Sequence, residues 1–358
     1  MAWHDNNGSA VTFVKSTSAQ SSSRKAGAIA CLSILSLLCM AALPGQVNAQ
    51  QEKEKAGEKT KPQTGEPAAE SERNHEYVRI RKNDRRLAVA LETSVVTMTD
   101  SPDFPGATVD LIGAVHLGET GYYEKLNAMF QEYDVVLFEA VMPEEAVRRN
   151  LRPGGKASAR KALTDEDEWT EAKVGLTAIS VLQLGMKDAL GLDFQLSAVD
   201  YTNPNFVHAD MTAEQFEETM KSRGESFSQM LAREMAKAMG QEQNPLATNL
   251  DVVLSALSND RVYRIRRIAA AQLAKAGDID PFAGSDGTST IITERNLAAL
   301  KVLRSELKKG HRKIGVFYGA GHFGDMEKRM VNDFRFVRSA ESWLVAWHLR
   351  PPENDDTK

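Results

Sequence analysis

The chain has 358 residues, of which 42% are hydrophobic and 26% are charged, and its formal net charge at pH 7 is −5. This composition is that of an ordinary globular protein and excludes a chain that is disordered throughout. Because the net charge is negative, nucleic acid is not an expected partner. The length allows one large domain or two modest ones, and the oligomeric state stays open.

Residues 1–49 have the pattern of a signal peptide. A polar start ends in the basic pair Arg24–Lys25, and an apolar stretch follows it. Val47-Asn48-Ala49 then has the spacing that a signal peptidase accepts, which places cleavage after Ala49. We therefore expect an exported protein, periplasmic or extracellular.

The two cysteines, Cys31 and Cys39, lie inside this apolar stretch. Its removal would leave a chain without thiols, which excludes disulfides, thiolate metal ligands and a cysteine nucleophile. The alternative is an uncleaved segment that anchors the protein, because the stretch is long enough to span a thin bilayer. Membrane contact is expected only through this segment.

Residues 50–75 carry almost no large apolar side chain, so they cannot bury enough surface to offset the entropy of ordering. We expect a disordered linker there, a folded domain over residues 76–350 and a short tail over 351–358. Since no internal repeat is found, the domain is expected to be a single α/β unit.

The first half of the domain predicts a hairpin followed by a β-α-β unit. Residues 77–99 contain two alternating runs, rich in Val and Thr, on either side of a turn at 83–84. An apolar run at 107–116, a helical segment at 119–133 and an apolar run at 134–141 come next. We expect the two strands of this unit to be parallel neighbours in one sheet.

The second half predicts two more buried strands, at 196–200 and 313–319, with helical segments between them. These helices are expected at about 212–240, 246–276 and 290–309, and residues 334–349 predict a final hairpin or edge pair. The expected fold class is therefore α/β, with a mostly parallel central sheet flanked by helices. A helical insertion and β-hairpin additions at the ends complete the expected architecture.

Four polar side chains follow expected strands directly: His116, Glu139, Asp200 and His322. Because ligands of open α/β sheets collect at the carboxyl ends of the strands, we expect these groups to converge. Nitrogen and oxygen ligands without sulfur suit Zn²⁺, Mn²⁺, Co²⁺ or Fe²⁺, and three protein ligands would leave a position for water. The alternatives are structural histidines and, for Glu139, a capping or ion-paired carboxylate.

Both histidines end a Gly-x-x-His pattern, which begins at Gly113 for His116 and at Gly319 for His322. Small residues before a histidine allow the backbone to bend sharply and to approach a bound group. The repetition of this pattern at two strand ends favours a functional role over a structural one.

At this point the sequence resembles the TraB/PrgY/GumN family, also called TIKI-like. The resemblance covers about residues 90–335 and is carried by LIGAVHLGETGYYEKLNAMFQEYDVVLFEAV, NPNFVHADMT, the Thr-Glu-Arg-Asn stretch at 293–296 and VFYGAGH. It implies an α/β domain related to the erythromycin esterase and ChaN folds. Animal members are membrane-associated metalloproteases that use Mn²⁺ or Co²⁺, and some bacterial relatives shut down peptide pheromones.

The resemblance also implies roles for individual residues. His116, Glu139 and His322 would hold the metal, with Glu139 also catalytic, and Arg295 would join the catalytic group. Mn²⁺ or Co²⁺ is the favoured ion and Zn²⁺ is possible, although the chain has no HExxH helix of the kind that zincins use. Arg295 could hold a substrate carboxylate or a ligand glutamate, or form a structural ion pair.

Three further residues are candidates for the pocket. Glu119 could reach the site but is favoured as the cap of a helix that begins near Thr120. His208 and Asp210 could join the pocket, whereas Asp210 could instead start the next helix. A last group of residues is expected to have no role in the site, as a solvated basic face or as histidines in linker, turn and tail: Arg261, Arg264, Arg266, Arg267, His75, His311 and His348.

Two functions are compatible with these residues. The first is an exported metal-dependent hydrolase, a peptidase acting on a peptide or protein, whose metal polarises the scissile carbonyl and lowers the pKa of bound water. The second is a non-catalytic protein that binds a peptide or a haem-like ligand on the same fold. Metal-dependent turnover would distinguish them.

Overall fold

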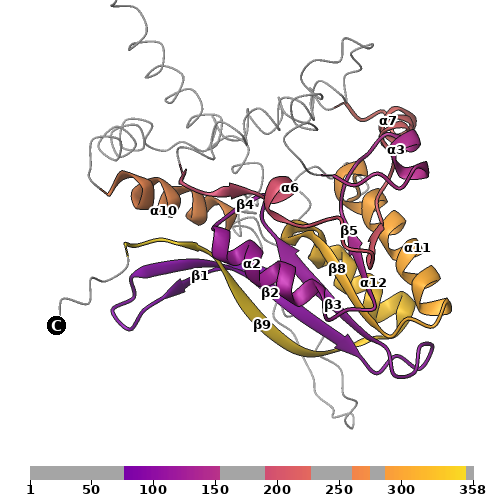
Figure 1. Ribbon diagram of the computed structural model, residues 1–358, viewed down its shortest axis with the longest axis horizontal. Helices are drawn as coiled ribbons and strands as arrows, with labels where there is room; N and C mark the ends of the chain where they lie inside the picture. The colour runs from indigo at the N-terminus through magenta and orange to yellow at the C-terminus, as the bar shows by residue number, and fades with distance from the viewer. Residues whose placement is uncertain (1–75, 154–189, 227–259, 275–286, 352–358) are drawn as a thin grey trace, which may run out of the picture.

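The computed structural model describes residues 76–153, 190–226, 260–274 and 287–351. In these ranges the chain forms a seven-stranded mixed sheet with helices on both faces, an α/β arrangement (Figure 1). The expected signal segment, linker and tail beyond 351, and much of the expected helical insertion, lie outside the described residues. No helix in the described ranges has the length and apolar character needed to cross a membrane.

The sheet runs in the order β1-β2-β3-β8-β5-β7, and β9 also pairs with β2. Strands β3, β8, β5 and β7 are parallel, whereas β1, β3 and β9 all pair antiparallel with β2, so the two kinds of pairing are equally common. The strand bounds are β1 Val78–Lys82, β2 Ala88–Thr99, β3 Thr108–Ala114, β5 Val135–Phe138, β7 Phe206–His208, β8 Lys313–Gly319 and β9 Val337–His348.

The two ends of the domain add antiparallel strands to this sheet. The predicted hairpin is confirmed as β1 and β2, and its turn is stabilised by the Asn83 side chain, which accepts the N–H groups of Arg85 and Leu87. The C-terminal segment forms one strand, β9, which lies along β2 from Ala90 to Thr99 and is not a hairpin of its own.

The predicted β-α-β unit is formed by β3, helix α2 (Thr120–Phe130) and β5, but its strands are not neighbours. Strand β8 lies between them and pairs in parallel with both. The expectation of adjacent strands is therefore wrong: β8, in which residues 314–318 are all buried, takes the place between them. This order brings the second Gly-x-x-His motif between the first motif and Glu139.

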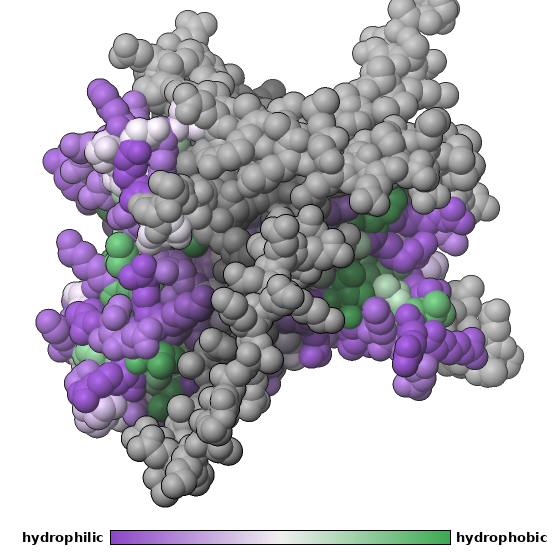
Figure 2. Space-filling model, turned by 180° about the vertical axis from the view of Figure 1, so that it is seen from behind, coloured by the Kyte–Doolittle hydropathy of each residue, from purple (hydrophilic) through white to green (hydrophobic). Residues whose placement is uncertain are grey.

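Alternate side chains of the strands face two separate hydrophobic clusters. Ile112 of β3 packs with α2 and α10 (Arg261–Leu273) on one face, and Leu111 packs with α11 (Arg295–Lys308) and α12 (Phe323–Phe334) on the other. The parallel strands are thus covered on both sides, as sheets of this kind require. Seen from behind in Figure 2, the described surface is mainly hydrophilic, with smaller hydrophobic areas between the polar side chains.

The prediction of a strand at 196–200 is wrong. Residues Gln195–Ala198 form the short helix α6, which follows a small ladder between β4 (Leu117–Gly118) and β6 (Asp193–Phe194). A short apolar run does not distinguish a strand from a helical turn by periodicity alone. The edge strand is instead β7, a few residues farther along the chain.

The predicted helices are found in part. The segment at 290–309 is helical, beginning as a π-helical turn, η1 (Thr290–Glu294), and continuing as α11. The helix expected at 212–240 is α7 (Ala213–Ser222) and ends early, because Gly224 has a positive φ of 65°. Helix α10 lies within the segment expected at 246–276. The remaining short helices are α3 (Glu144–Arg148) and the 3₁₀ turn η2 (Ala320–His322).

Candidate functional site

Three adjacent parallel strands end at the same edge of the sheet and place the three predicted residues there. Ala114 at the end of β3 is opposite Gly319 at the end of β8, and Phe138 at the end of β5 is opposite Phe317. His116, His322 and Glu139 follow these strand ends within a few residues. The strand-end placement expected from the sequence is found for all three.

Both carboxylate oxygens of Glu139 have partners at this edge. Its Oε2 accepts the Gly319 N–H at 2.7 Å, and its Oε1 accepts a guanidinium N–H of Arg295 at 2.6 Å. His322 Nε2 lies 3.6 Å from the same Oε1. Although burial would raise the pKa of Glu139, the charges of Arg295 and His322 hold it well below its ordinary value of 4.5. Glu139 is therefore ionised at neutral pH.

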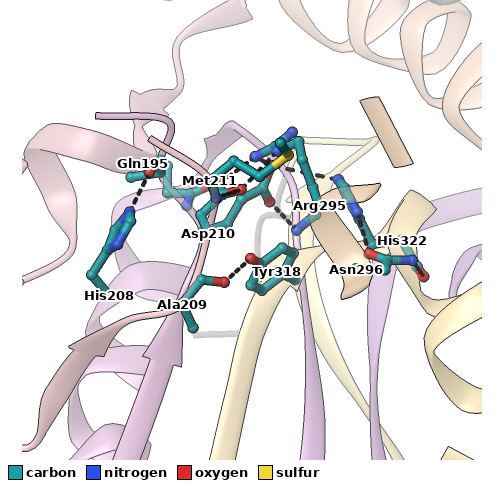
Figure 3. A network of polar contacts seen from close by, with 12 residues as sticks. Gln195, His208, Ala209, Asp210, Met211, Arg295, Asn296, Tyr318 and His322 are labelled. Atoms are coloured by element: carbon teal, nitrogen blue, oxygen red, sulfur yellow. Dashed lines mark hydrogen bonds and ion pairs between the residues drawn. The ribbon is translucent and has the colours of Figure 1, made fainter. Parts of the chain in front are cut away.

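Arg295 lies between two buried carboxylates. It donates from Nε and Nη2 to the two oxygens of Asp210, at 3.0 and 2.6 Å, and from Nη2 to Glu139. Figure 3 shows its guanidinium between Asp210 and His322, near the Tyr318 ring. Burial would lower the pKa of Arg295, but Asp210 and Glu139 raise it well above its ordinary value. Asp210 therefore belongs to the site and does not start the next helix, which Thr212 caps.

The local sequence explains why Arg295 points into the site. The Ser289 side chain accepts the Ile292 N–H and starts the π-helical turn, which then passes into α11 at Arg295. Single π-helical turns change the direction of side chains at the start of a helix and are frequent at functional sites. The stretch Thr-Glu-Arg-Asn thus places Arg295 toward Glu139 and Asn296 toward His322.

The orientation of His322 is determined by Asn296. The Asn296 Nδ2 donates to the His322 carbonyl at 3.0 Å and to Asp325 at 2.9 Å, so its Oδ1 is the atom that faces His322 Nδ1, at 2.7 Å. Because an amide oxygen can only accept, Nδ1 carries a proton. His322 therefore turns its other ring nitrogen, Nε2, toward Glu139.

His116 differs from the other two residues because its side chain is exposed to solvent. It lies close enough to the charged groups of the site for them to act on its pKa. The surrounding protein desolvates the ring and lowers the pKa of His116; Glu139 opposes this shift, and Arg295 adds to it. The imidazole is therefore neutral at neutral pH and in contact with solvent.

The first glycine of each Gly-x-x-His motif is required by close packing. A Cβ on Gly319 would lie 3.3 Å from Glu139 Oε2, and one on Gly113 would lie 3.0 Å from the Ser94 carbonyl oxygen. Among the described residues, by contrast, a Cβ on Gly321 would meet no heavy atom within 4 Å. The two motif glycines thus allow the strand ends to pack closely against the Ser94 carbonyl and the Glu139 carboxylate.

Two other predicted pocket residues have structural partners elsewhere. Asp200 does not end a strand; its exposed carboxylate accepts the N–H and hydroxyl of Thr202 in a turn. His208 ends β7, the next parallel strand, and its Nε2 lies 2.7 Å from the Ala140 carbonyl oxygen. The expectation that Asp200 joins the strand-end site is therefore wrong.

Glu119 occupies the N-cap position of α2, but its side chain makes no capping hydrogen bond. It accepts instead from Arg266 and from both the backbone and ring N–H groups of His348. The expected capping side chain is wrong, because a buried guanidinium offers a stronger partner than the helix N–H groups. The solvated position expected for Arg266 is wrong for the same reason, and the contact of His348 with Glu119 lies outside the strand-end site.

Sequence reasoning did not assign a role to three residues of the site. Asn296 follows Arg295 in the Thr-Glu-Arg-Asn stretch, which is the signal that could have found it. Tyr318 is buried beside the His322 ring, and its hydroxyl donates to the Ala209 carbonyl. Gln195 bonds to the backbone of His116 and has no recognisable motif around it.

A divalent ion does not fit this arrangement of His116, Glu139 and His322. Both Glu139 oxygens already accept hydrogen bonds, one of them from the positively charged Arg295. An ion bound to Oε1 would lie beside that guanidinium, where like charges repel. Within the described ranges, no group of three or more His, Cys, Asp and Glu side chains is arranged to hold a metal ion.

Comparisons with known proteins assign no function to the chain. No family model matches the sequence, and no curated protein matches it significantly. The resemblance to the TraB/PrgY/GumN family therefore stays a prediction.

Proposed function

We propose that the protein is a hydrolase that cleaves peptide bonds at the candidate site with a water molecule that His116 deprotonates. The observation that carries this proposal is an exposed histidine with a lowered pKa beside the buried ion pair of Glu139 and Arg295. A neutral imidazole in contact with solvent can accept a proton from water at neutral pH. The choice of peptides as substrates rests on the family resemblance alone.

Glu139 and His116 have different roles in this mechanism because of Arg295. The guanidinium lowers the pKa of Glu139, so the carboxylate does not take the proton itself. Its negative charge stabilises the imidazolium that forms when His116 takes a proton from water. The hydroxide oxygen bonds to the scissile carbon, His116 returns the proton to the leaving nitrogen, and the carbon–nitrogen bond breaks.

His322 orients a group at the centre of the site. Its Nδ1 donates to Asn296, so its Nε2 is the ring nitrogen that faces Glu139 Oε1, at 3.6 Å. A water molecule or a substrate amide beside this pair can form hydrogen bonds to both side chains. We assign this position to the reacting water or to the amide of the substrate.

The test is peptide turnover by the purified protein in EDTA and with added Mn²⁺, Co²⁺ or Zn²⁺. We expect turnover in EDTA, a loss of about 100-fold or more in His116→Ala, and little change in His311→Ala. His311 is the matched control, because it follows α11 and pairs with Glu306 instead of a site residue.

Two outcomes would contradict the proposal. Turnover that requires an added ion would favour the metal-dependent hydrolase expected from the sequence. A wild type that cleaves no peptide of a broad library, with or without metal, would favour the binding protein.

We also propose that the protein acts outside the cytoplasm, on the basis of the signal-like residues 1–49. The expected mature chain begins at Gln50, which the intact mass of the protein from its native host would show. A chain that retains Cys31 and Cys39 would instead support a membrane anchor.

A further inference from the structure

Gln195 lies against His116 although the two are far apart in the sequence. Strand β4 directly follows His116 and pairs with β6, which directly precedes Gln195. The Gln195 backbone N–H donates to the His116 carbonyl at 2.9 Å. The small β4–β6 ladder therefore holds the glutamine beside the histidine at the edge of the sheet.

The side chain of Gln195 is buried and only half satisfied. Its residue exposure is 4%, and its Nε2 donates to the Tyr201 hydroxyl at 3.1 Å. Its Oε1 is excluded from solvent and makes no hydrogen bond to any described residue. Leaving a buried carbonyl oxygen unpaired costs about 1–3 kcal/mol, so this oxygen requires a donor.

The imidazole of His116 is the donor available to this oxygen. Desolvation by the surrounding protein lowers the pKa of His116, and the Gln195 side chain acts against this shift. An amide oxygen accepts but does not donate, so it selects the tautomer with a ring N–H facing it. The other ring nitrogen then carries the lone pair.

We propose that Gln195 is a positioning residue for His116. Its side-chain oxygen accepts the imidazole N–H, holds the ring in one tautomer and leaves the other nitrogen free to take a proton from water. This last step rests on the proposed function, whereas the hydrogen bond and the tautomer exist without turnover. Tyr201 holds the amide in the orientation that this contact requires.

The test combines the tautomer of His116 with the kinetics of the variants. In protein labelled with ¹⁵N-histidine, the ring nitrogen signals of His116, assigned by their loss in His116→Asn, should show one neutral tautomer in the wild type. Gln195→Leu and Gln195→Met, which lack an acceptor, should show a mixture of tautomers. Their kcat should fall about 10- to 100-fold with KM nearly unchanged, as for residues that orient a catalytic group.

Two further variants separate positioning from stability. Gln195→Glu keeps an oxygen acceptor, so it should retain the single tautomer and restore most of kcat. Gln272→Leu removes another buried glutamine oxygen that has no hydrogen bond among the described residues, and it should leave His116 unchanged because Gln272 lies on α10. It controls for the loss of a buried glutamine as such.

The outcomes keep this inference distinct from the proposed function. A single tautomer in Gln195→Leu or Gln195→Met, or a mixture in the wild type, would overturn the role of Gln195. If the wild type cleaves no peptide, the proposed function fails, and the nitrogen signals still decide whether Gln195 holds His116.

Discussion

Glu139 is charged although it is nearly buried, because its neighbours supply the hydrogen bonds and the opposite charge that stabilise a carboxylate in water. The Gly319 N–H and the Arg295 guanidinium bind its two oxygens, and Asp210 in turn balances the charge of Arg295. An uncompensated charge at this position would be costly, so each partner supports the others. The charged state of Glu139 therefore depends on all of these partners together.

Gly319→Ala tests whether the position of the Glu139 carboxylate matters, because it adds a single carbon atom beside it. The new Cβ would lie 3.3 Å from Glu139 Oε2, so the carboxylate must shift away from both of its donors. We expect kcat/KM to fall about tenfold or more, since small displacements of catalytic groups have large effects on rate. Gly321→Ala is the matched control in the same loop and should be nearly silent. Equal rates for the two variants would contradict the close packing at Gly319.

His116 and Glu139 should behave as one unit in kinetics. If the ionised Glu139 acts by stabilising the imidazolium of His116, the carboxylate has little left to stabilise once the imidazole is removed. We therefore expect the double variant His116→Ala/Glu139→Gln to be scarcely slower than His116→Ala alone. Additive losses in the free energy of activation would show that the two residues act independently.

The sequence predicted which residues lie at the strand ends, but not which residues they contact. His116, Glu139 and His322 follow apolar runs that end with small residues or a charge, and these patterns are local. Gln195 and Arg266 could not be predicted, because their roles depend on contacts with segments far away in the chain. Such contacts leave no periodicity in the sequence.

At the scale of elements, the position of β8 decides which residues meet. Its insertion between β3 and β5 places His322 next to Glu139, where neighbouring β3 and β5 would have excluded it. The strand itself was predicted from its apolar run, but its place in the sheet was not. Strands β3, β5 and β8 are all buried apolar runs, so their sequences do not distinguish which of them lies in the middle.

Arg266 of α10 connects several elements near the end of β9. Its guanidinium donates to the Leu190, Gly191 and His348 carbonyls and to Glu119. The segment before β6, the start of α2 and the end of β9 are therefore held by one side chain. This explains why a residue of a basic helix is buried with 6% exposure.

Arg266→Met should destabilise the fold by about 3 kcal/mol, because it removes the cation that pairs with Glu119 and the donor of three backbone carbonyls. The free energy of unfolding in urea would measure the change. Arg264→Met is the matched control on the same helix and, as an exposed residue, should change stability by about 0.5 kcal/mol or less. A similar loss in both variants would show that the basic helix, and not the buried guanidinium, carries the effect.

At the scale of the whole molecule, the sheet separates two hydrophobic layers and has helices on both faces (Figure 1). The overall α/β class was predictable because strands and helices alternate along most of the chain. The balance of parallel and antiparallel pairing was not predictable. It depends on β9 returning to β2, across the whole length of the domain.

The two titrating groups of the site predict how the stability of the whole protein depends on pH. The folded-state pKa of His116 lies below its ordinary value of 6.5, so the unfolded chain binds more protons as the pH falls below about 6.5, and stability decreases. The folded-state pKa of Glu139 lies below 4.5, so its contribution is complete above that pH and is lost as the pH falls through the folded-state value. Both groups therefore favour folding at higher pH.

Urea unfolding at a series of pH values from about 3 to about 8 would separate these contributions. This range begins below the ordinary pKa of Glu139 and ends above that of His116. We expect His116→Asn to reduce the slope of stability against pH just below 6.5, because the variant has no group that titrates there. Glu139→Gln should be less stable than the wild type at neutral pH, since Arg295 loses one of its two carboxylates, and should reduce the slope below 4.5. An unchanged slope in either variant would mean that the site does not perturb that group, and the charge pattern assigned to this edge of the sheet would then be incorrect.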